Sequence, residues 1–169
     1  MTGAPGAGKT ALIKEISEVL YRADEHHAVV DLDELCRGVF PASAADFGLD
    51  LAIENLAAVW SNFKRRGVRR LVAARIVQSA DELVRISSAL PDCEFTICRL
   101  TAAPAVLESR IHRREAGSSA PFLSSVVQRL AQDIDAIEFP MITVDNGPQA
   151  SIIELANQVL RSAGWPSDA

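Results

Sequence analysis

The stretch GAPGAGKT, residues 3–10, fits the pattern G-x-x-x-x-G-K-[ST] in full. In this pattern successive backbone N–H groups wrap around a phosphate, and glycines are needed where a side chain would block its approach. We expect Lys9 to reach the outer phosphates of ATP and the Thr10 hydroxyl to coordinate Mg²⁺. An amphipathic helix follows, and the positive end of its dipole adds to the anion site. The residues expected to line the nucleotide are Gly3, Ala4, Pro5, Gly6, Ala7, Gly8, Lys9 and Thr10.

Only Met1 and Thr2 stand in front of this loop, although such a loop normally follows a buried strand. Either the strand begins ahead of Met1, or the protein tolerates a first strand truncated to a stub of two residues. We favour the first, because an open slot leaves backbone donors and acceptors inside the core. The space beside the strand that starts near Arg70 should be empty or filled by this stub.

Apolar residues alternate between strand and helix periods along almost the whole chain, which predicts a parallel sheet with helices on both faces. The chain is therefore expected to be one domain, residues 1–169, with a three-layer α/β/α fold. The expected strands are 27–33, 70–77, 94–100 and 140–145, and the expected helices follow the loop or cover 49–63, 81–90, 104–111, 126–137 and 152–160.

Composition narrows the class of function. Lys and Arg number 17 against 22 for Asp and Glu, which gives a net charge of −5 and argues against nucleic-acid binding. Hydrophobic residues make up 49% of the chain, but no apolar run approaches the length of about 18 residues that a membrane span needs. We expect a cytoplasmic protein that contacts neither membrane nor nucleic acid.

A pair of acids follows the strand after the loop, in the stretch VVDLDEL. With the side-chain period of two in a strand, Asp31 and Asp33 are expected to point to the same side of the sheet. One carboxylate can then hold the metal while the other handles a substrate hydroxyl. The alternative is that Asp33 only caps the turn that follows.

Arg75 lies inside an otherwise apolar run, near the carboxyl end of the next strand. A buried guanidinium at this place either binds an anionic group of the substrate or forms a salt bridge to an acid such as Asp33. Both interpretations remain open from the residues alone.

Three segments together resemble a known group of enzymes. They are GAPGAGKT, the DLD of residues 31–33, and LTAAPAVLESRIHRRE at residues 100–115. They resemble the P-loop NTPase fold, and within it the small-molecule kinases of the adenylate-kinase-like group, such as shikimate kinase, gluconate kinase, adenylylsulfate kinase and chloramphenicol phosphotransferase. The chain is also similar to actinobacterial ATP-binding proteins of unassigned substrate.

The resemblance implies roles for particular residues. Asp31 would lie on the Mg²⁺ side with Thr10, and Asp33 would bind or deprotonate the acceptor. Arginines of the last segment would clamp the ATP phosphates, and the stretch at about 115–121 would be a short lid. These arginines are Arg110, Arg113 and Arg114, of which the first and last share a helix face. The alternative for each is an exposed basic helix end.

The function expected on these grounds is transfer of the ATP γ-phosphate to a hydroxyl of a small molecule, with Lys9, Asp33, Arg110 and Arg114 as catalytic residues. One alternative is an ATPase or nucleotide-sensing module without transfer, and another is a nucleotide or adenylylsulfate kinase. The glycine run of shikimate kinases is replaced by AARIVQ at residues 73–78, and Arg37 follows Asp33 by four residues where adenylylsulfate kinases have a spacing of three. The acceptor is therefore not carried over from either.

Overall fold

A computed structural model describes residues 1–38, 48–114 and 119–168. The strands are β1 (His27–Asp31), β2 (Arg70–Ala74), β3 (Cys98–Thr101) and β4 (Ile142–Asp145). The helices are α1 (Lys9–Arg22), α2 (Leu32–Leu35), α3 (Leu49–Lys64), α4 (Ala80–Ser88), α5 (Pro104–Arg114), α6 (Ser119–Asp135) and α7 (Ile152–Ser162). Each helix and strand expected from the periodicity is present, and α2 is an additional short helix.

The sheet consists of two parallel pairs of strands. β1 pairs with β2, with Asp31 opposite Ala74, and β3 pairs with β4, with Thr101 opposite Asp145. The carboxyl ends of the strands therefore meet at one edge of the sheet, where ligands bind in open α/β folds.

The first two residues join these pairs. The amino nitrogen of Met1 donates a hydrogen bond to the Ala73 carbonyl (2.8 Å). On the other side the Thr2 N–H donates to the Cys98 carbonyl (2.7 Å), and Thr2 forms a parallel bridge with Arg99. The expected stub is confirmed, and the order across the sheet is β1, β2, stub, β3, β4.

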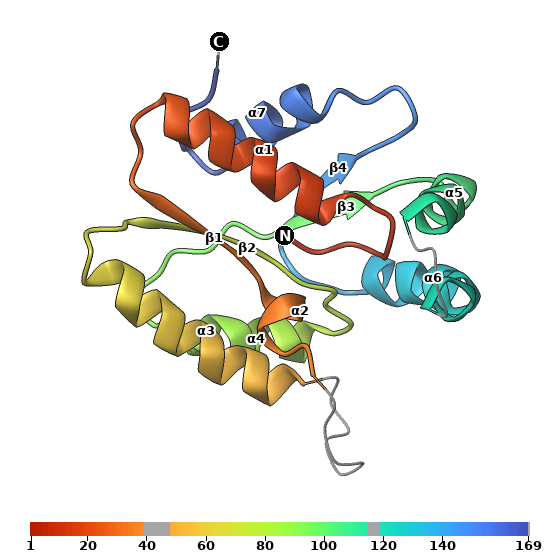
Figure 1. Cartoon of the computed structure of the whole chain (residues 1–169), viewed down its shortest axis with the longest axis horizontal. Helices are drawn as coiled ribbons and strands as arrows, with labels where there is room; N and C mark the ends of the chain where they lie inside the picture. The colour runs from red at the N-terminus through yellow and green to blue at the C-terminus, as the bar shows by residue number, and fades with distance from the viewer. Residues whose placement is uncertain (39–47, 115–118, 169) are drawn as a thin grey trace.

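Helices cover both faces of the sheet, as expected for the α/β/α fold (Figure 1). α1 and α7 pack together on one face, and α3 and α4 lie on the other. α5 and α6 pack against each other beyond the loop that precedes α1. In the described part of the chain, none of the helices is apolar and long enough to traverse a bilayer.

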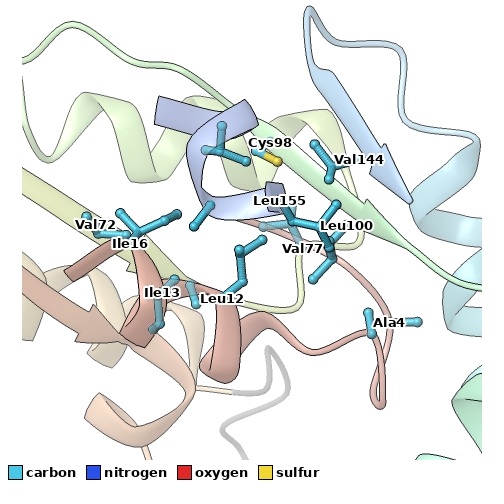
Figure 2. Packing of buried hydrophobic residues seen from close by; sticks show 14 of the residues in the cluster. Ala4, Leu12, Ile13, Ile16, Val72, Val77, Cys98, Leu100, Val144 and Leu155 are labelled. Atoms are coloured by element: carbon cyan, nitrogen blue, oxygen red, sulfur yellow. The ribbon is translucent and has the colours of Figure 1, made fainter. Parts of the chain in front are cut away.

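Two clusters of buried side chains hold the layers together. The larger lies between α1, α7 and the sheet, where side chains such as Ile16, Val72 and Leu100 meet (Figure 2). The smaller packs α3 under β1 through Val30 and Trp60. The apolar face predicted for α1 is fully buried, and it consists of Leu12, Ile13, Ile16, Val19 and Leu20.

Several boundaries differ from the expectation. β2 ends at Ala74 rather than at residue 77, and β4 begins at Ile142 rather than at residue 140. β3 starts at Cys98 rather than at residue 94. The Ile97 carbonyl still accepts from the Ile142 N–H of β4, but none of the described strands pairs with residues 94–96.

β1 stops at Asp31, whose side chain caps α2. Of the stretch expected as a short lid at about 115–121, residues 115–118 lie outside the described residues, and residues 119–121 form the start of α6.

Candidate active site

The candidate site lies at the carboxyl ends of the strands. The loop of residues 3–10 leaves the stub there, Asp31 ends β1, and Asn146 follows β4. The helix α1 begins at Lys9 and directs its N-terminus toward the same place, which adds positive potential for a phosphate.

Two positions of the loop, Gly6 and Gly8, require glycine. Gly6 has φ of +81°, and a Cβ atom there would lie 2.6 Å from the Leu107 carbonyl oxygen of α5. Gly8 has φ of +100°, and a Cβ atom there would lie 2.5 Å from Nδ2 of Asn146. Both positions combine a left-handed backbone with close packing, so a side chain is excluded on two grounds.

The side chain of Lys9 folds back onto the loop of residues 3–10. Its Nζ atom donates to the Gly3 carbonyl at 2.8 Å and approaches the Ala4 carbonyl at 3.4 Å. The ammonium group is thus held beside the backbone groups that would surround the phosphates.

Thr10 and Asp31 form the candidate metal site. The Thr10 hydroxyl donates to Oδ2 of Asp31 at 3.2 Å, while Oδ1 of Asp31 accepts from the Asp33 backbone N–H at 3.1 Å. A hydroxyl and a carboxylate are hard oxygen ligands, and Mg²⁺ is commonly bound by one or two such groups together with phosphate oxygens. The donor set fits Mg²⁺.

Asp33 faces a different partner. Its Oδ1 lies 3.5 Å from NH1 of Arg75, and its Oδ2 accepts from the Ile76 N–H at 3.3 Å. The expectation that Asp31 and Asp33 share one side of an extended strand is wrong, because α2 begins between them. The cap of that helix is Asp31 and not Asp33.

Burial raises the pKa of the Asp33 carboxyl, opposed by the nearby Lys9 and Arg75 cations and by the Ile76 N–H, while the Asp31 carboxylate raises it further. The side chain remains 39% exposed, so it is still accessible to a ligand. A carboxylate that is partly desolvated yet accessible is suited to accept a proton from a hydroxyl.

Arg75 is buried, with only 5% of its surface exposed. Of the two interpretations of this residue, the structure contains the ion pair with Asp33. Its Nε lies 4.0 Å from Oε2 of Glu82, and among the described residues neither of these two buried atoms has a hydrogen-bond partner. Burial also raises the pKa of Glu82, opposed chiefly by Arg75.

The three arginines of α5 differ in their surroundings. Arg110 reaches the loop, since NH1 lies 3.4 Å from the Gly6 carbonyl and NH2 lies 3.4 Å from the Gly147 carbonyl. Arg113 is exposed, and Arg114 ends the helix with a side chain outside the described set. Of the two arginines whose side chains are described, Arg110 contacts the loop.

Asn146 is a site residue that sequence reasoning missed. Its Nδ2 donates to the Ala7 carbonyl at 2.7 Å, and the residue is only 7% exposed. The signal was available, because an amide directly after the strand in TVDNG sits at the same edge of the sheet as the loop.

Glu82 was also missed, because Ser79 correctly predicts a helix start and an acid in the first turn has an ordinary role there. Only the packing of α4 against the end of β2 brings its carboxyl near Arg75.

Comparison with solved structures shows the same fold in several proteins. A tunicamycin resistance protein from Deinococcus radiodurans superposes with a TM-score of 0.68 at 17% identity, covering 99% of this chain and 96% of that one. A sugar kinase from Janibacter sp. HTCC2649 gives 0.65 at 14% identity, covering 96% and 91%. An APS kinase from Mycobacterium tuberculosis, solved with AMPPNP and APS, gives 0.61 at 15% identity, covering 96% and 94%. No protein-family model matches the chain, and no curated protein matches its sequence.

These similarities establish the fold that the chain shares with kinases of small molecules. At 14–17% identity they do not carry an acceptor from one protein to another.

Proposed function

We propose that the chain is an ATP- and Mg²⁺-dependent phosphotransferase that moves the γ-phosphate to a hydroxyl group of a small molecule. The fold shared with small-molecule kinases supports the class of reaction. The reaction is assigned to the cytoplasm, and neither a membrane nor a nucleic acid takes part in it.

The observation that carries this proposal is the divergence of two neighbouring acids. Asp31 contacts the Thr10 hydroxyl of the loop, whereas Asp33 turns toward Arg75 and keeps an accessible carboxylate. Transfer to a hydroxyl needs both carboxylates. In a module that only hydrolyses ATP, the Asp33 carboxylate would orient the attacking water, so the dependence of ADP release on an acceptor decides between the two functions.

In the proposed reaction each of these residues has a separate role. The loop and Lys9 bind the phosphates, and Arg110 stabilises negative charge that develops on the transferred group. Thr10 and Asp31 hold Mg²⁺, which neutralises phosphate charge when bound. Asp33 orients the acceptor hydroxyl and takes its proton as the new oxygen–phosphorus bond forms. The bond from the γ-phosphorus to the bridging oxygen breaks, and ADP leaves.

Arg75 is assigned to holding Asp33 and not to binding an anionic acceptor. Its side chain is only 6% exposed, whereas that of Asp33 is 39% exposed, so an incoming ligand meets the carboxylate first. Arg75 is thus a positioning residue whose charge keeps Asp33 ionisable.

The test begins with ADP release from ATP and Mg²⁺ across sugars, nucleosides, aminoglycoside-type and nucleoside antibiotics, and shikimate-like acids. With the acceptor that this screen identifies, Asp33→Asn should lower the transfer rate by about 10²- to 10⁴-fold, the usual contribution of a general base. The affinity for ATP should change much less, since Asp33 accepts hydrogen bonds from Arg75 and Ile76 and acts on the loop through the charge of Lys9.

Glu34→Gln is the matched control, because Glu34 is the next residue and its side chain is exposed. This variant should transfer at the normal rate. Full activity of Asp33→Asn would contradict the role of Asp33. ADP release at the same rate with and without every acceptor would favour the ATPase alternative, and a response to nucleotides or adenylylsulfate alone would favour the nucleotide-kinase alternative.

A further inference from the structure

Arg75 lies close to two carboxylates, and only one of them has a role in the proposed reaction. NH1 of Arg75 lies 3.5 Å from Oδ1 of Asp33, whereas Nε lies 4.0 Å from Oε2 of Glu82 at the start of α4. The side chain of Arg75 is buried, and so is most of the side chain of Glu82. Glu82 is therefore placed to act on the site through Arg75 and not by contact with a ligand.

The interaction between Arg75 and Glu82 is one of charge. Neither Nε of Arg75 nor Oε2 of Glu82 has a hydrogen-bond partner among the described residues, although both atoms are buried. Buried polar atoms without partners are rare and costly, so a pair of them at a functional site requires an explanation. What the two groups retain at 4.0 Å is the attraction of opposite charges, which is strong where water is excluded.

The charges beside the accessible Asp33 carboxylate are unbalanced. The Arg75 cation has the Asp33 and Glu82 carboxylates as its two acidic neighbours, which leaves one negative charge in excess. Lys9 and Asp31 carry opposite charges and do not alter this sum. With the nucleotide bound, the phosphates of ATP balance Lys9, and Mg²⁺ balances Asp31.

Other cations near this part of the site have acidic partners of their own. Arg85, whose charge also acts on the buried acid of α4, forms an ion pair with Asp50 of α3. Arg37 forms an ion pair with Glu34. The sequence of residues 39–47, which connects α2 to α3, contains no Lys, Arg or His. Within the described part of the chain, an anionic group that enters beside the acceptor carboxylate meets no unbalanced cation.

We infer that the acceptor is a hydroxyl compound without a carboxylate, sulfate or phosphate group, and that Glu82 is the residue that sets this specificity. The inference rests on the proposed function, because it concerns the acceptor of the same site. Glu82 compensates Arg75 from within the protein, so the guanidinium holds Asp33 without attracting an anionic ligand. With an uncharged residue at position 82, Arg75 and Asp33 form a neutral pair, and an anionic acceptor meets less repulsion.

Glu82→Gln and Asp81→Asn are the two variants that test this role. Glutamine has the shape of glutamate and keeps an oxygen for the hydrogen bond from the Gln78 N–H. Asp81 precedes Glu82 in the first turn of the same helix but is exposed, so its replacement removes the same charge from the same helix end. A general effect of charge or of the helix dipole should therefore appear in both variants.

The first measurement needs no acceptor. At about pH 7, the relaxation of the Asp33 and Ile76 amide protons is recorded with a trimethylammonium nitroxide and with a carboxylate nitroxide of similar size. The ammonium probe should relax these amides more strongly in the unchanged chain. Glu82→Gln should lower the ratio of the two effects by about three- to tenfold, as expected for one charge at about 10 Å, partly screened. Asp81→Asn should leave the ratio nearly unchanged.

The second measurement uses pairs of acceptors that differ in one anionic group: sorbitol and gluconate, glucose and glucuronate, methyl shikimate and shikimate. ADP release from ATP and Mg²⁺ should be faster with the uncharged member of a pair. Glu82→Gln should raise kcat/KM for the anionic member, relative to the uncharged member, by about three- to tenfold, mainly through KM. Asp81→Asn should not change this relative value.

The outcomes distinguish this inference from the proposed function. If ADP release depends on no acceptor of either class, transfer is contradicted, while the ratio of the two probes still decides the role of Glu82. The inference is overturned if the carboxylate probe relaxes the two amides as strongly as the ammonium probe does in the unchanged chain. Equal effects of Glu82→Gln and Asp81→Asn, or faster transfer to the anionic acceptors, would also overturn it. If Glu82→Gln does not fold, the measurements on the unchanged chain decide.

Discussion

The environment of Asp33 decides how its ionisation affects the folded protein. An acid whose pKa rises on folding holds its proton more tightly in the folded chain than in the unfolded chain, so its ionisation destabilises the folded state. This loss is absent well below the ordinary Asp pKa of 3.8, grows as the pH rises, and is complete above the raised pKa of the folded protein. Arg75 and Lys9 limit it without removing it.

Asp33→Asn should therefore change the pH dependence of stability in a defined direction. The free energy of unfolding of the variant, minus that of the unchanged chain, should increase as the pH rises from about 4 and become constant above the raised pKa. The attraction between Arg75 and the Asp33 carboxylate is already part of the shift of the Asp33 pKa, so only the changed hydrogen bonds of the amide add an offset that does not depend on pH. Denaturant unfolding at several pH values measures the difference, with Glu34→Gln as the exposed control. A difference that falls with rising pH would refute the direction assigned to the Asp33 pKa.

Asn146 connects the last strand to the phosphate loop through one buried hydrogen bond. Asn146→Ala leaves the Ala7 carbonyl without this donor, which should destabilise the protein by about 1–3 kcal/mol. The loop should also become less ordered, and the Kd for ATP should rise by about tenfold, which corresponds to about 1.4 kcal/mol. Thermal unfolding and titration calorimetry measure the two effects.

Asn62→Ala is the control, since Asn62 is exposed on α3. If Asn146→Ala lowers stability without changing the Kd for ATP, Asn146 serves only the packing of β4 and not the loop.

The contact between the loop and α5 links two elements that the sequence separates by a hundred residues. Gly6→Ala places a methyl group 2.6 Å from the Leu107 carbonyl oxygen, so the loop or the helix must shift. Because Arg110 of the same helix contacts the Gly6 carbonyl, the shift should disturb both groups that face the phosphates. We expect stability to fall by about 1–3 kcal/mol and ATP affinity to decrease.

Gly67→Ala separates backbone strain from this clash. Gly67 has φ of +85°, close to that of Gly6, but a Cβ atom there would contact nothing within 4 Å. The Gly67→Ala variant should lose about 1 kcal/mol of unfolding free energy from the left-handed backbone, and its ATP binding should not change. Equal losses of ATP affinity in the two variants would show that the contact with Leu107 is unimportant.

The elements themselves could be predicted from sequence because each amphipathic or apolar run reports its own periodicity. The buried face of α1 and the Ser79 cap of α4 are examples. The ends of a strand that depend on a neighbouring strand to pair with could not be predicted. β3 is short because none of the described strands pairs with residues 94–96, and the run EFTICRL contains no sign of this.

Across the whole molecule, the phosphate loop and the acids after β1 could be found because their motif fixes the residues in a short stretch. Arg75 and Glu82 show the limit of that approach. Their proximity depends on how α4 packs on the end of β2, and a sequence pattern does not encode that distance. The same holds for Asn146, which lies 139 residues from the loop carbonyl that it binds.

The central claim is that the loop, with Lys9, binds the phosphates of ATP. Titration calorimetry with ATP and Mg²⁺ tests it most directly, applied to the unchanged chain, to Lys9→Ala, and to Lys14→Ala, whose lysine is exposed on the same helix. Lys9→Ala should weaken binding by about 10- to 100-fold, the value of a hydrogen bond to a charged group, while circular dichroism shows an unchanged fold. Lys14→Ala should bind ATP normally. Equal affinities of all three proteins, or no ATP binding by the unchanged chain, would contradict the account.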